Sequence, residues 1–441
     1  MNNIKFNNIK IKFIFFIYNI VTYVLIPFIL FSLIKKTFKN KQYCHHWQER
    51  WGKVILKNSI HKPVIWVHTV SVGETKAAQA LIALYQNNMP QYQILITVMS
   101  ITGRQTATNI YQNVIVCYLP YDFNFAMHSF FNKFKPRIGI IFETEIWPNL
   151  LKTAYQKNIP VFLVNARLSY QSYKRYKKFR GAIAVIINHF TIIMTQNNQT
   201  AQYFKQLGYK KTIHNIGNTK FDITDNQINA KQIITIKQKI NTMKTIICFA
   251  SSRDHEEKIL LDCLKNRDNT NNSWQDVIFL LIPRHPERFT TVEKIIKEYK
   301  FKYQKRSNLV TINKDTQIIL GDSMGELLGY YAVSKIAIIG GSFQPLGGQN
   351  PLEATFMSKP VIFGPHMFNF SQISQDLLAS GLAFQSTDMK DALDICRTIL
   401  KDKPVFTNKC HNFIHNYSGA SKKIIINTKP YLLQKYNKAH Y

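Results

Sequence analysis

Short apolar runs alternate with longer amphipathic segments along most of the chain after residue 62. Runs of three to six residues that are rich in Val and Ile are typical of strands buried on both faces of a parallel sheet. Helix-length segments separate most of these runs, as in repeated strand–helix–strand units. The pattern predicts an α/β fold with strands at residues 64–67, 94–98, 114–119, 138–142, 161–164, 191–194, 245–250, 277–282, 317–320, 336–339 and 361–363.

A polar stretch divides this pattern into two halves. Residues 223–244 are rich in Asn, Gln, Lys and Thr, and we interpret them as a linker that contains a short helix. We expect a Rossmann-like domain at residues 42–222, a second one at residues 245–427, and a basic tail at residues 428–441. Ligands of doubly wound sheets bind beyond the carboxyl ends of the strands, so we expect the site in a cleft between the two domains.

One apolar run near the N-terminus is long enough to cross a membrane. Residues 13–34 carry no charge, and a helix of this length spans a bilayer core of about 30 Å. Lysines flank the run on both sides, and their slight excess after it favours a cytoplasmic location for the rest of the chain. The pattern predicts an N-terminal anchor over residues 1–41, and a buried core helix is the alternative.

Composition adds a bias toward anionic partners. The 441 residues are 46% hydrophobic, which excludes a disordered chain, and carry a net charge of +32. Such an excess favours nucleic acid, anionic lipid or phosphorylated substrates, although the abundance of Lys, Asn and Ile explains part of it by composition alone. Six scattered cysteines without a Cys-x-x-Cys pair indicate a reducing compartment and no zinc site.

Candidate chemistry lies at the strand ends of the first half. Glu74 follows the first predicted strand and opens a helix, where a carboxylate serves as a catalytic base or simply as a helix cap. Glu143 and Glu145 follow the strand at 138–142 and suit a sugar or hydroxyl site, with helix capping as the alternative. Lys220 lies near the linker, and its own sequence context predicts an ordinary surface lysine.

The second half offers a glycine-rich strand-to-helix turn at residues 340–353. Bare backbone and helix N–H groups can cradle an anion there, but a tight turn without a ligand explains the glycines equally well. Arg284 follows another strand and can bind a phosphate with two hydrogen bonds. Residues 170–180 interleave aromatic and basic side chains and suit anionic lipid or phosphate, or form a solvated charged face.

Ten segments together resemble the 3-deoxy-D-manno-octulosonic acid (Kdo) transferases of Gram-negative lipopolysaccharide synthesis. The segments are RWGK (50–53), HTVSVGE (68–74), ETEIWPNL (143–150), NARLS (165–169), GNTKFD (217–222), PRHPERF (283–289), GDSMGEL (321–327), GGS (340–342), NPLE (350–353) and GPHMFNF (364–370). The resemblance implies a GT-B fold, two Rossmann-like domains that face a cleft. It implies inverting transfer of Kdo from CMP-Kdo to the 6′-hydroxyl of a lipid A precursor (lipid IVA), with release of CMP. It also implies no metal or other cofactor, and a single-pass inner-membrane anchor with the catalytic domains facing the cytoplasm.

The resemblance also assigns roles to individual residues. It implies that Glu74 is the general base and that Glu143 and Lys220 stabilise the transition state. It implies CMP binding by nine residues in three segments: Pro283, Arg284, Met324, Gly325, Glu326, Asn350, Pro351, Leu352 and Glu353. Two positions depart from the common family pattern, since Gln349 stands where many members have His and Ala354 where many have Pro.

Two other functions compete with this one. A related GT-B transferase that uses a UDP-sugar in lipid A synthesis would carry similar strand-end motifs. A membrane-tethered nucleic-acid-binding protein would account for the net charge but not for the motifs. The expected partners are therefore CMP-Kdo, the lipid A precursor and inner-membrane lipids, and not nucleic acid.

Overall fold

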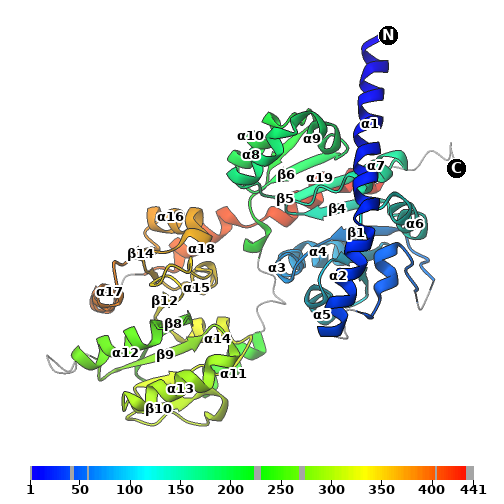
Figure 1. Cartoon of the computed structure of the whole chain (residues 1–441). Helices are drawn as coiled ribbons and strands as arrows, with labels where there is room; N and C mark the ends of the chain where they lie inside the picture. Colours follow the sequence, from blue (N-terminus) through cyan, green and yellow to red (C-terminus); the bar gives the residue numbers. More distant parts are fainter. Residues whose placement is uncertain are drawn as a thin grey trace. The chain divides into compact units, whose positions relative to one another are not determined.

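The computed structural model describes residues 2–39, 44–56, 59–222, 230–267, 274–402 and 405–433. The chain forms two compact units, of which one comprises Met1–Ile223 with Tyr417–Tyr441 and the other Thr224–Asn416. Each unit is built on a seven-stranded sheet whose strand pairs are all parallel (Figure 1). The predicted α/β class with two doubly wound domains is confirmed.

The first sheet has the order β3-β2-β1-β4-β5-β6-β7. Apolar side chains alternate between its two faces, and helices cover both. One face packs against α6, α7, α9 and α10, the other against α4, α5 and α19. The strands are β1 (Val64–His68), β2 (Gln93–Val98), β3 (Val114–Tyr118), β4 (Ile138–Phe142), β5 (Val161–Ala166), β6 (Ile192–Thr195) and β7 (Ile213–Asn215). The helices after residue 43 are η2 (Trp47–Trp51), α3 (Val72–Ala77), α4 (Gln79–Asn88), α5 (Ile101–Ile110), α6 (Asn124–Phe134), α7 (Pro148–Gln156), α8 (Tyr170–Lys178), α9 (Arg180–Ile187), α10 (Asn198–Gln206), η3 (Thr219–Phe221) and α19 (Ala420–Leu433).

The second sheet has the order β10-β11-β9-β8-β12-β13-β14. Its strands are β8 (Thr245–Ser252), β9 (Val277–Pro283), β10 (Tyr303–Lys305), β11 (Ile318–Leu320), β12 (Ile336–Ile339), β13 (Val361–Phe363) and β14 (Ala383–Gln385). Its helices are α11 (Ala230–Lys239), α12 (Glu256–Arg267), η4 (Pro286–Arg288), α13 (Phe289–Glu298), η5 (Arg306–Asn308), α14 (Leu327–Val333), α15 (Leu352–Phe356), η6 (Phe368–Phe370), α16 (Ser371–Ala379), α17 (Met389–Asp402) and α18 (Thr407–Tyr417).

All eleven predicted strands are present, and three further strands were not predicted. The missed strands are β7, β10 and β14, each of three residues. All three lie at an outer position of their sheet. A strand at an edge needs fewer apolar residues than a central one, so its apolar pattern is weak.

The domain boundaries need two corrections. Residues 223–229 of the predicted linker lie outside the described residues, but its later part forms α11, which belongs to the second unit. Ile236 of α11 is fully buried against Gly329 of α14. At the other end, the segment after residue 416 belongs to the first unit, so the second domain does not extend to residue 427.

The last helix, α19, packs on the first sheet because one of its faces is apolar. Ile424, Thr428 and Leu432 are spaced by four residues and are almost fully buried. The Thr428 hydroxyl lies 2.5 Å from the Tyr85 hydroxyl of α4. Residues 428–433 of the predicted basic tail therefore belong to α19, and Thr428 and Leu432 are buried in the first unit. The later part of the predicted tail lies outside the described residues.

Replacing Ile424 by Ala is expected to lower the free energy of unfolding by about 2–4 kcal/mol, because it leaves a cavity between α19 and the sheet. Ile426→Ala is a matched control on the same helix, since Ile426 is 69% exposed. We expect its effect to stay within about 0.5 kcal/mol. Urea unfolding followed by circular dichroism measures both, and equal effects would contradict the packing of α19.

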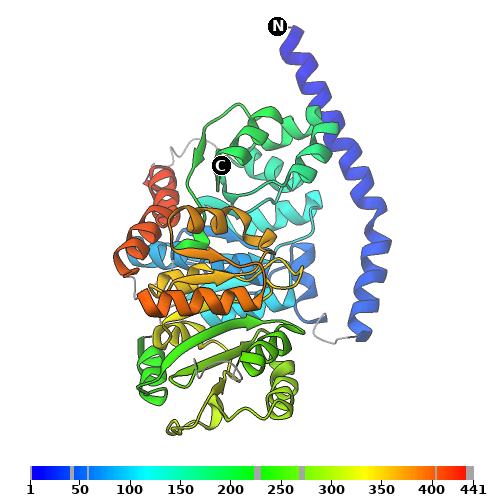
Figure 2. The ribbon, with the colours of Figure 1, turned by 90° about the vertical axis from the view of Figure 1, so that its left-hand side faces the viewer.

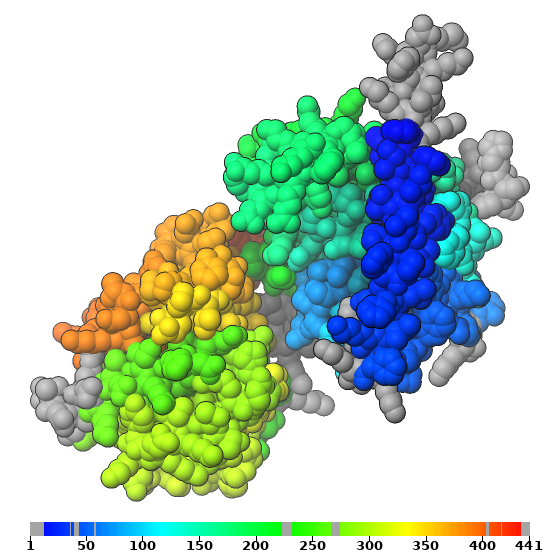
Figure 3. All heavy atoms as spheres, viewed as in Figure 1, coloured from blue at the N-terminus to red at the C-terminus, as the bar shows by residue number. Residues whose placement is uncertain are grey.

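The predicted N-terminal anchor is helical and lies along the first unit. It consists of α1 (Asn2–Val24) and α2 (Ile26–Lys39), interrupted at Leu25 because Pro27 has no N–H to donate. Figure 2 shows the helix running along one flank of the unit, and Figure 3 shows it as a ridge on the surface. The segment Phe13–Lys35 is long and apolar enough to cross a membrane, by length and composition.

One face of this N-terminal helix is docked by specific contacts. Phe15 is 1% exposed, and its ring lies 6.0 Å from that of His189. The Tyr18 hydroxyl donates to Asp122 at 2.9 Å, and the Asn149 amide donates to the Asn19 side chain at 2.8 Å. The opposite face exposes large apolar side chains, among them Phe16, Phe28 and Phe31. The helix is thus held to the unit on one side and presents an apolar surface on the other.

Candidate active site

Glu74 lies at the carboxyl end of the first sheet, in the first turn of α3. Ser71 caps this helix, and its hydroxyl donates to Glu74 Oε1 at 2.9 Å. The Val70 N–H donates to Glu74 Oε2 at 2.8 Å. Glu74 therefore has the position of a capping carboxylate, the alternative left open by its sequence context.

The environment of Glu74 also makes it a candidate base. The side chain is almost fully buried, and this burial raises the pKa of its carboxyl. The hydrogen bonds from Val70 and Ser71 lower the pKa, the charge of Glu143 raises it, and the charge of Lys220 lowers it. A raised carboxyl pKa improves a base, because the group then holds a proton more firmly once it has taken it.

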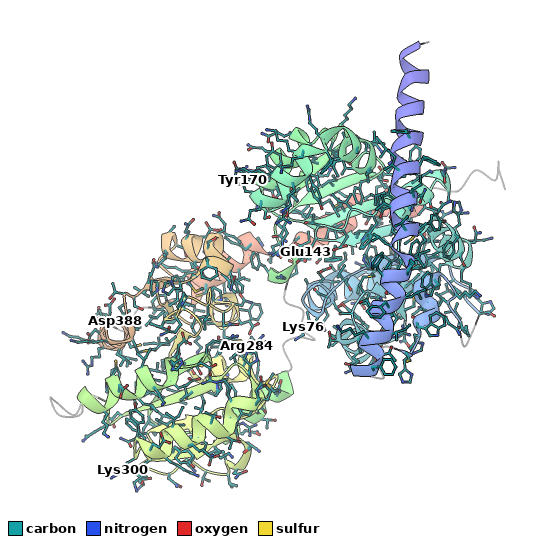
Figure 4. All side chains as sticks on the ribbon, in the orientation of Figure 1. Lys76, Glu143, Tyr170, Arg284, Lys300 and Asp388 are labelled. Atoms are coloured by element: carbon teal, nitrogen blue, oxygen red, sulfur yellow. The ribbon has the colours of Figure 1, made fainter. Side chains whose placement is uncertain are left out.

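Glu143, which is labelled in Figure 4, follows β4 directly and forms ion pairs with two cations. Its carboxylate lies 3.6 Å from Lys220 Nζ and 3.3 Å from Arg167 Nε. Its backbone has a φ of 58°, an unfavourable value for a side chain of this kind. The structure therefore brings together the three predicted catalytic residues, Glu74, Glu143 and Lys220, from distant parts of the sequence.

A network of side-chain caps holds Lys220 in place. Lys220 lies on the short helix η3, and Asn218 accepts a hydrogen bond from its backbone N–H at 3.0 Å. The buried Asn165, at the end of β5, accepts from the Thr219 N–H at 3.1 Å. Asp222 accepts from the N–H groups of Gly419 and Ser421 at the start of α19. Lys220 is thus an exposed lysine, as its sequence context predicts, but these caps hold its backbone and its ammonium is paired with Glu143.

Glu145 joins the same acidic cluster. It accepts a hydrogen bond of 2.7 Å from the Trp147 ring N–H. Burial raises the pKa of Glu145 to about 7, the hydrogen bond from Trp147 lowers it, and the charges of Glu74 and Glu143 raise it. The sequence predicts a sugar or hydroxyl site at this strand end from Glu143 and Glu145, and both carboxylates belong to this cluster.

The raised pKa of Glu145 predicts a pH-dependent effect on stability. The pKa of this carboxyl is about 7 in the folded protein and near its ordinary value of 4.5 in the unfolded chain. The free energy of unfolding therefore falls progressively between pH 4.5 and 7, and the loss is complete above pH 7. Glu145→Gln is expected to raise the free energy of unfolding by about 1–2 kcal/mol at pH 8, after allowance for partial exposure, and to change it little at pH 5. Urea unfolding at both pH values measures this, with Glu287→Gln, on an exposed glutamate, as the control. A loss of stability at pH 8 would contradict the burial of Glu145.

In the second unit, Arg284 follows β9, whose last residue is Pro283. Its backbone N–H donates to the Ser252 carbonyl at 3.0 Å, which ties the loops after β8 and β9 together. Its side chain is exposed, and Nε donates to Gln349 Oε1 at 3.2 Å. Gln349 therefore contacts a candidate binding residue directly.

The glycine-rich turn after β12 does not offer free N–H groups as expected. Both oxygens of the buried Glu256 accept from this turn, one from the Gly341 N–H at 2.7 Å and the other from the Phe343 N–H at 3.0 Å. Gly340 is required by packing, because a side chain there would lie 2.5 Å from the Ser251 carbonyl oxygen. The contacts described for residues 340–343 are therefore those of a tight turn closed by Glu256, and the N–H groups of Gly341 and Phe343 are not free to bind an anion.

The other two candidate CMP-binding segments also lie at strand ends of this sheet. Glu326 is paired with Arg306 at 2.8 Å, and the neighbouring Gly325 and the exposed Met324 leave the backbone accessible. Asn350 accepts from the Leu352 N–H at 3.2 Å, at the start of α15. Pro351 and Leu352 are buried, and Glu353 lies in the first turn of that helix.

Arg253 was not singled out by the motifs, although it follows β8 directly. Its guanidinium Nη1 lies 3.0 Å from His285 Nε2. The rule that ligands bind at carboxyl ends of strands would have pointed to this position.

Comparisons with known proteins agree with the arrangement of these strand-end motifs. A family model described as 3-deoxy-D-manno-octulosonic-acid transferase (kdotransferase) matches residues 45–223. The 3-deoxy-D-manno-octulosonic acid transferase of Haemophilus influenzae is 33% identical over 412 residues, which cover 92% of this chain and 96% of that protein. The enzyme of the same name from Bordetella pertussis is 32% identical and covers 82% of this chain and 86% of its own.

Among solved structures, a glycosyltransferase from Rickettsia africae has a TM-score of 0.53 over 85% of this chain and all of its own, at 15% identity. At that identity the likeness concerns the fold alone. The two sequence relatives named above are more informative, since they match 92% and 82% of the chain and carry the same enzyme name. The chain therefore belongs to the Kdo transferase family, the glycosyltransferases that add Kdo in lipopolysaccharide synthesis.

Proposed function

We propose that this enzyme transfers Kdo from CMP-Kdo to the 6′-hydroxyl of a lipid A precursor, lipid IVA, with inversion and release of CMP. The observation that carries the proposal is the cluster of Glu74, Glu143 and Lys220 at the carboxyl end of the first sheet. Such a transfer requires a general base for the acceptor hydroxyl and a positive charge that stabilises the transition state, and a buried carboxylate beside a cation provides both.

In the proposed reaction, the acceptor oxygen attacks the anomeric carbon of Kdo. The new carbon–oxygen bond forms as the bond between that carbon and the phosphate oxygen breaks, and CMP leaves with the bonding electrons. The acceptor hydroxyl gives its proton to the Glu74 carboxylate. The Lys220 ammonium offsets negative charge that develops in the transition state, and Glu143 holds that ammonium in place at 3.6 Å.

The donor nucleotide is assigned to the second unit. The proposed CMP-binding residues, Pro283 with Arg284, 324–326 and 350–353, all follow strands of one parallel sheet. Since CMP carries a single phosphate, arginine side chains can neutralise it, and the proposed chemistry requires no metal or other cofactor. Nucleic acid is not a proposed partner.

The released nucleotide separates this proposal from the nearest alternative. Purified enzyme with lipid IVA and CMP-Kdo is expected to release CMP in proportion to the acceptor consumed. A related transferase would instead release UDP from a UDP-sugar and leave CMP-Kdo intact, and that result would refute the proposed donor.

We also propose that the N-terminal helix attaches the enzyme to the inner membrane, with the catalytic units on the cytoplasmic side. The segment Phe13–Lys35 has the required length and hydropathy, and its outward face is apolar. The acceptor is a membrane lipid, so attachment would hold the enzyme where its substrate lies.

Placing charge on the exposed face of this helix is expected to release the protein from membranes. In Phe28→Glu/Phe31→Glu, two side chains that are 68% and 69% exposed become charged, which opposes burial in lipid. Flotation with inner-membrane vesicles measures the bound fraction. Val310→Glu/Val405→Glu is the control, because it adds the same charge at exposed apolar positions of the second unit. Equal flotation of both variants would contradict attachment through this face.

A further inference from the structure

Two arginines lie side by side at the rim of the second sheet, and only one of them has been assigned a ligand. Arg253 follows β8 and Arg284 follows β9, which are adjacent strands. The Arg284 N–H donates to the carbonyl of Ser252, the residue before Arg253, at 3.0 Å. The two loops are therefore joined, and the two arginines start from neighbouring positions at the same edge of the sheet.

The described side-chain contacts of both guanidinium groups are with a histidine and an amide. Arg253 contacts His285, and Arg284 contacts Gln349. In the described part of the chain, neither of the two forms an ion pair with a carboxylate. By contrast, Arg288 is paired with Glu257 and Asp254. Two adjacent cations without carboxylate partners favour the binding of anionic groups.

The glycine-rich turn beside them offers an anion fewer N–H groups than its sequence suggests. Glu256 already occupies the N–H groups of Gly341 and Phe343, and α15 is only five residues long. Arg253 lies against this turn, since its Cγ is 3.4 Å from the position that a Cβ on Gly341 would take. A glycine at 341 thus keeps open the space next to the Arg253 side chain.

The donor of the proposed reaction carries two anionic groups close together. The anomeric carbon of Kdo bears the phosphate oxygen and, on the same carbon, the carboxylate of the sugar acid. A site for this donor needs two neighbouring cations, whereas a nucleotide linked to a neutral sugar needs cations for its phosphates only. We propose, resting on the proposed function, that Arg284 binds the phosphate and Arg253 binds the Kdo carboxylate, which makes Arg253 a specificity residue for sugar acids.

Initial rates of transfer test this assignment through two constants, the KM for CMP-Kdo and the inhibition constant of CMP. Arg253→Ala is expected to raise the KM for CMP-Kdo by about 10- to 100-fold and to leave inhibition by CMP within about twofold, because CMP lacks the carboxylate. Arg253→Lys keeps the charge but cannot form bidentate hydrogen bonds to a carboxylate, so it should give an intermediate KM. Arg284→Ala is expected to raise both the KM for CMP-Kdo and the inhibition constant of CMP.

Lys258→Ala is the matched control, since it removes an exposed cation from α12 without altering the site. Its two constants should equal those of the wild type, and thermal unfolding of each variant checks that the fold is retained. Equal changes in both constants for Arg253→Ala, or no change in either, would overturn the carboxylate assignment alone. Wild-type enzyme that is not inhibited by CMP would instead overturn the proposed donor.

Discussion

Replacing Glu74 by Gln is expected to lower kcat for Kdo transfer by a factor of about 10²–10⁴, the usual contribution of a general base. Gln has the size of Glu but cannot take the proton of the acceptor hydroxyl. The affinity for CMP-Kdo should change by no more than about twofold, because Glu74 is assigned to the acceptor side of the reaction. Single-turnover kinetics with labelled donor and calorimetric binding of CMP-Kdo measure the two quantities.

The substitution of Glu74 by Gln also alters the N-terminal cap of α3, so its effect on stability needs a control. Glu74 accepts hydrogen bonds from Val70 and Ser71, and the Gln amide keeps only part of that cap. We expect a loss of stability of about 1 kcal/mol, which leaves the protein folded. Ser71→Ala removes the helix cap while keeping the carboxylate, and it should retain most of the turnover. Undiminished kcat in Glu74→Gln would remove Glu74 from the role of base.

Replacing Lys220 by Ala is expected to lower kcat by a factor of about 10²–10³, as removal of one preorganised charge at a transition state typically does. It should also shift the acid limb of the pH–rate profile to higher pH. The reason is that the Lys220 charge lowers the pKa of Glu74, so its removal lets that pKa rise and leaves the base protonated at a higher pH. The profile of kcat/KM between pH 5 and 9 reports this shift.

Lys76→Ala is the matched control for Lys220→Ala. Lys76 is an exposed cation on α3, two residues from Glu74, and it has no assigned role (labelled in Figure 4). Its removal should leave both kcat and the acid limb close to those of the wild type. A purely structural role for Lys220 would reduce kcat without moving the acid limb, and that outcome would contradict the proposed electrostatic role.

The sequence predicts the central strands well because their burial is encoded locally. β1, β4 and β12 are continuous apolar runs, and the residues that follow each of them are necessarily at the same edge of a parallel sheet. For this reason the strand pattern alone is enough to predict that Glu74 and Glu143 lie at one edge of the first sheet. The short edge strands β7, β10 and β14 lack such a local signature.

Contacts between distant segments could not be predicted in this way. The Tyr85 and Thr428 hydroxyls meet across 343 residues, and nothing near residue 428 indicates that α19 returns to the first sheet. Glu256 and Gly341 are 85 residues apart, so the loss of free N–H groups in the glycine-rich turn is visible only in three dimensions. The same applies to Lys220, whose importance depends on Glu143 rather than on its own surroundings in sequence.

The role of Glu74 could not be predicted from the sequence for a different reason. Capping and catalysis require the same residue type at the same place, so the sequence alone leaves both interpretations open. The structure shows that the capping contacts exist, and it places the cation of Lys220 and the carboxylate of Glu143 close enough to influence the same group. The two interpretations are therefore compatible, and only the loss of turnover separates them.

The most direct measurement is mass spectrometry of the product after incubation of the purified enzyme with CMP-Kdo and tetra-acylated lipid A precursor. The proposed reaction predicts an acceptor whose mass has grown by one or more Kdo residues, with an equivalent amount of free CMP. An unmodified acceptor in the presence of CMP-Kdo, together with growth by a neutral sugar when a UDP-sugar is supplied, would contradict it.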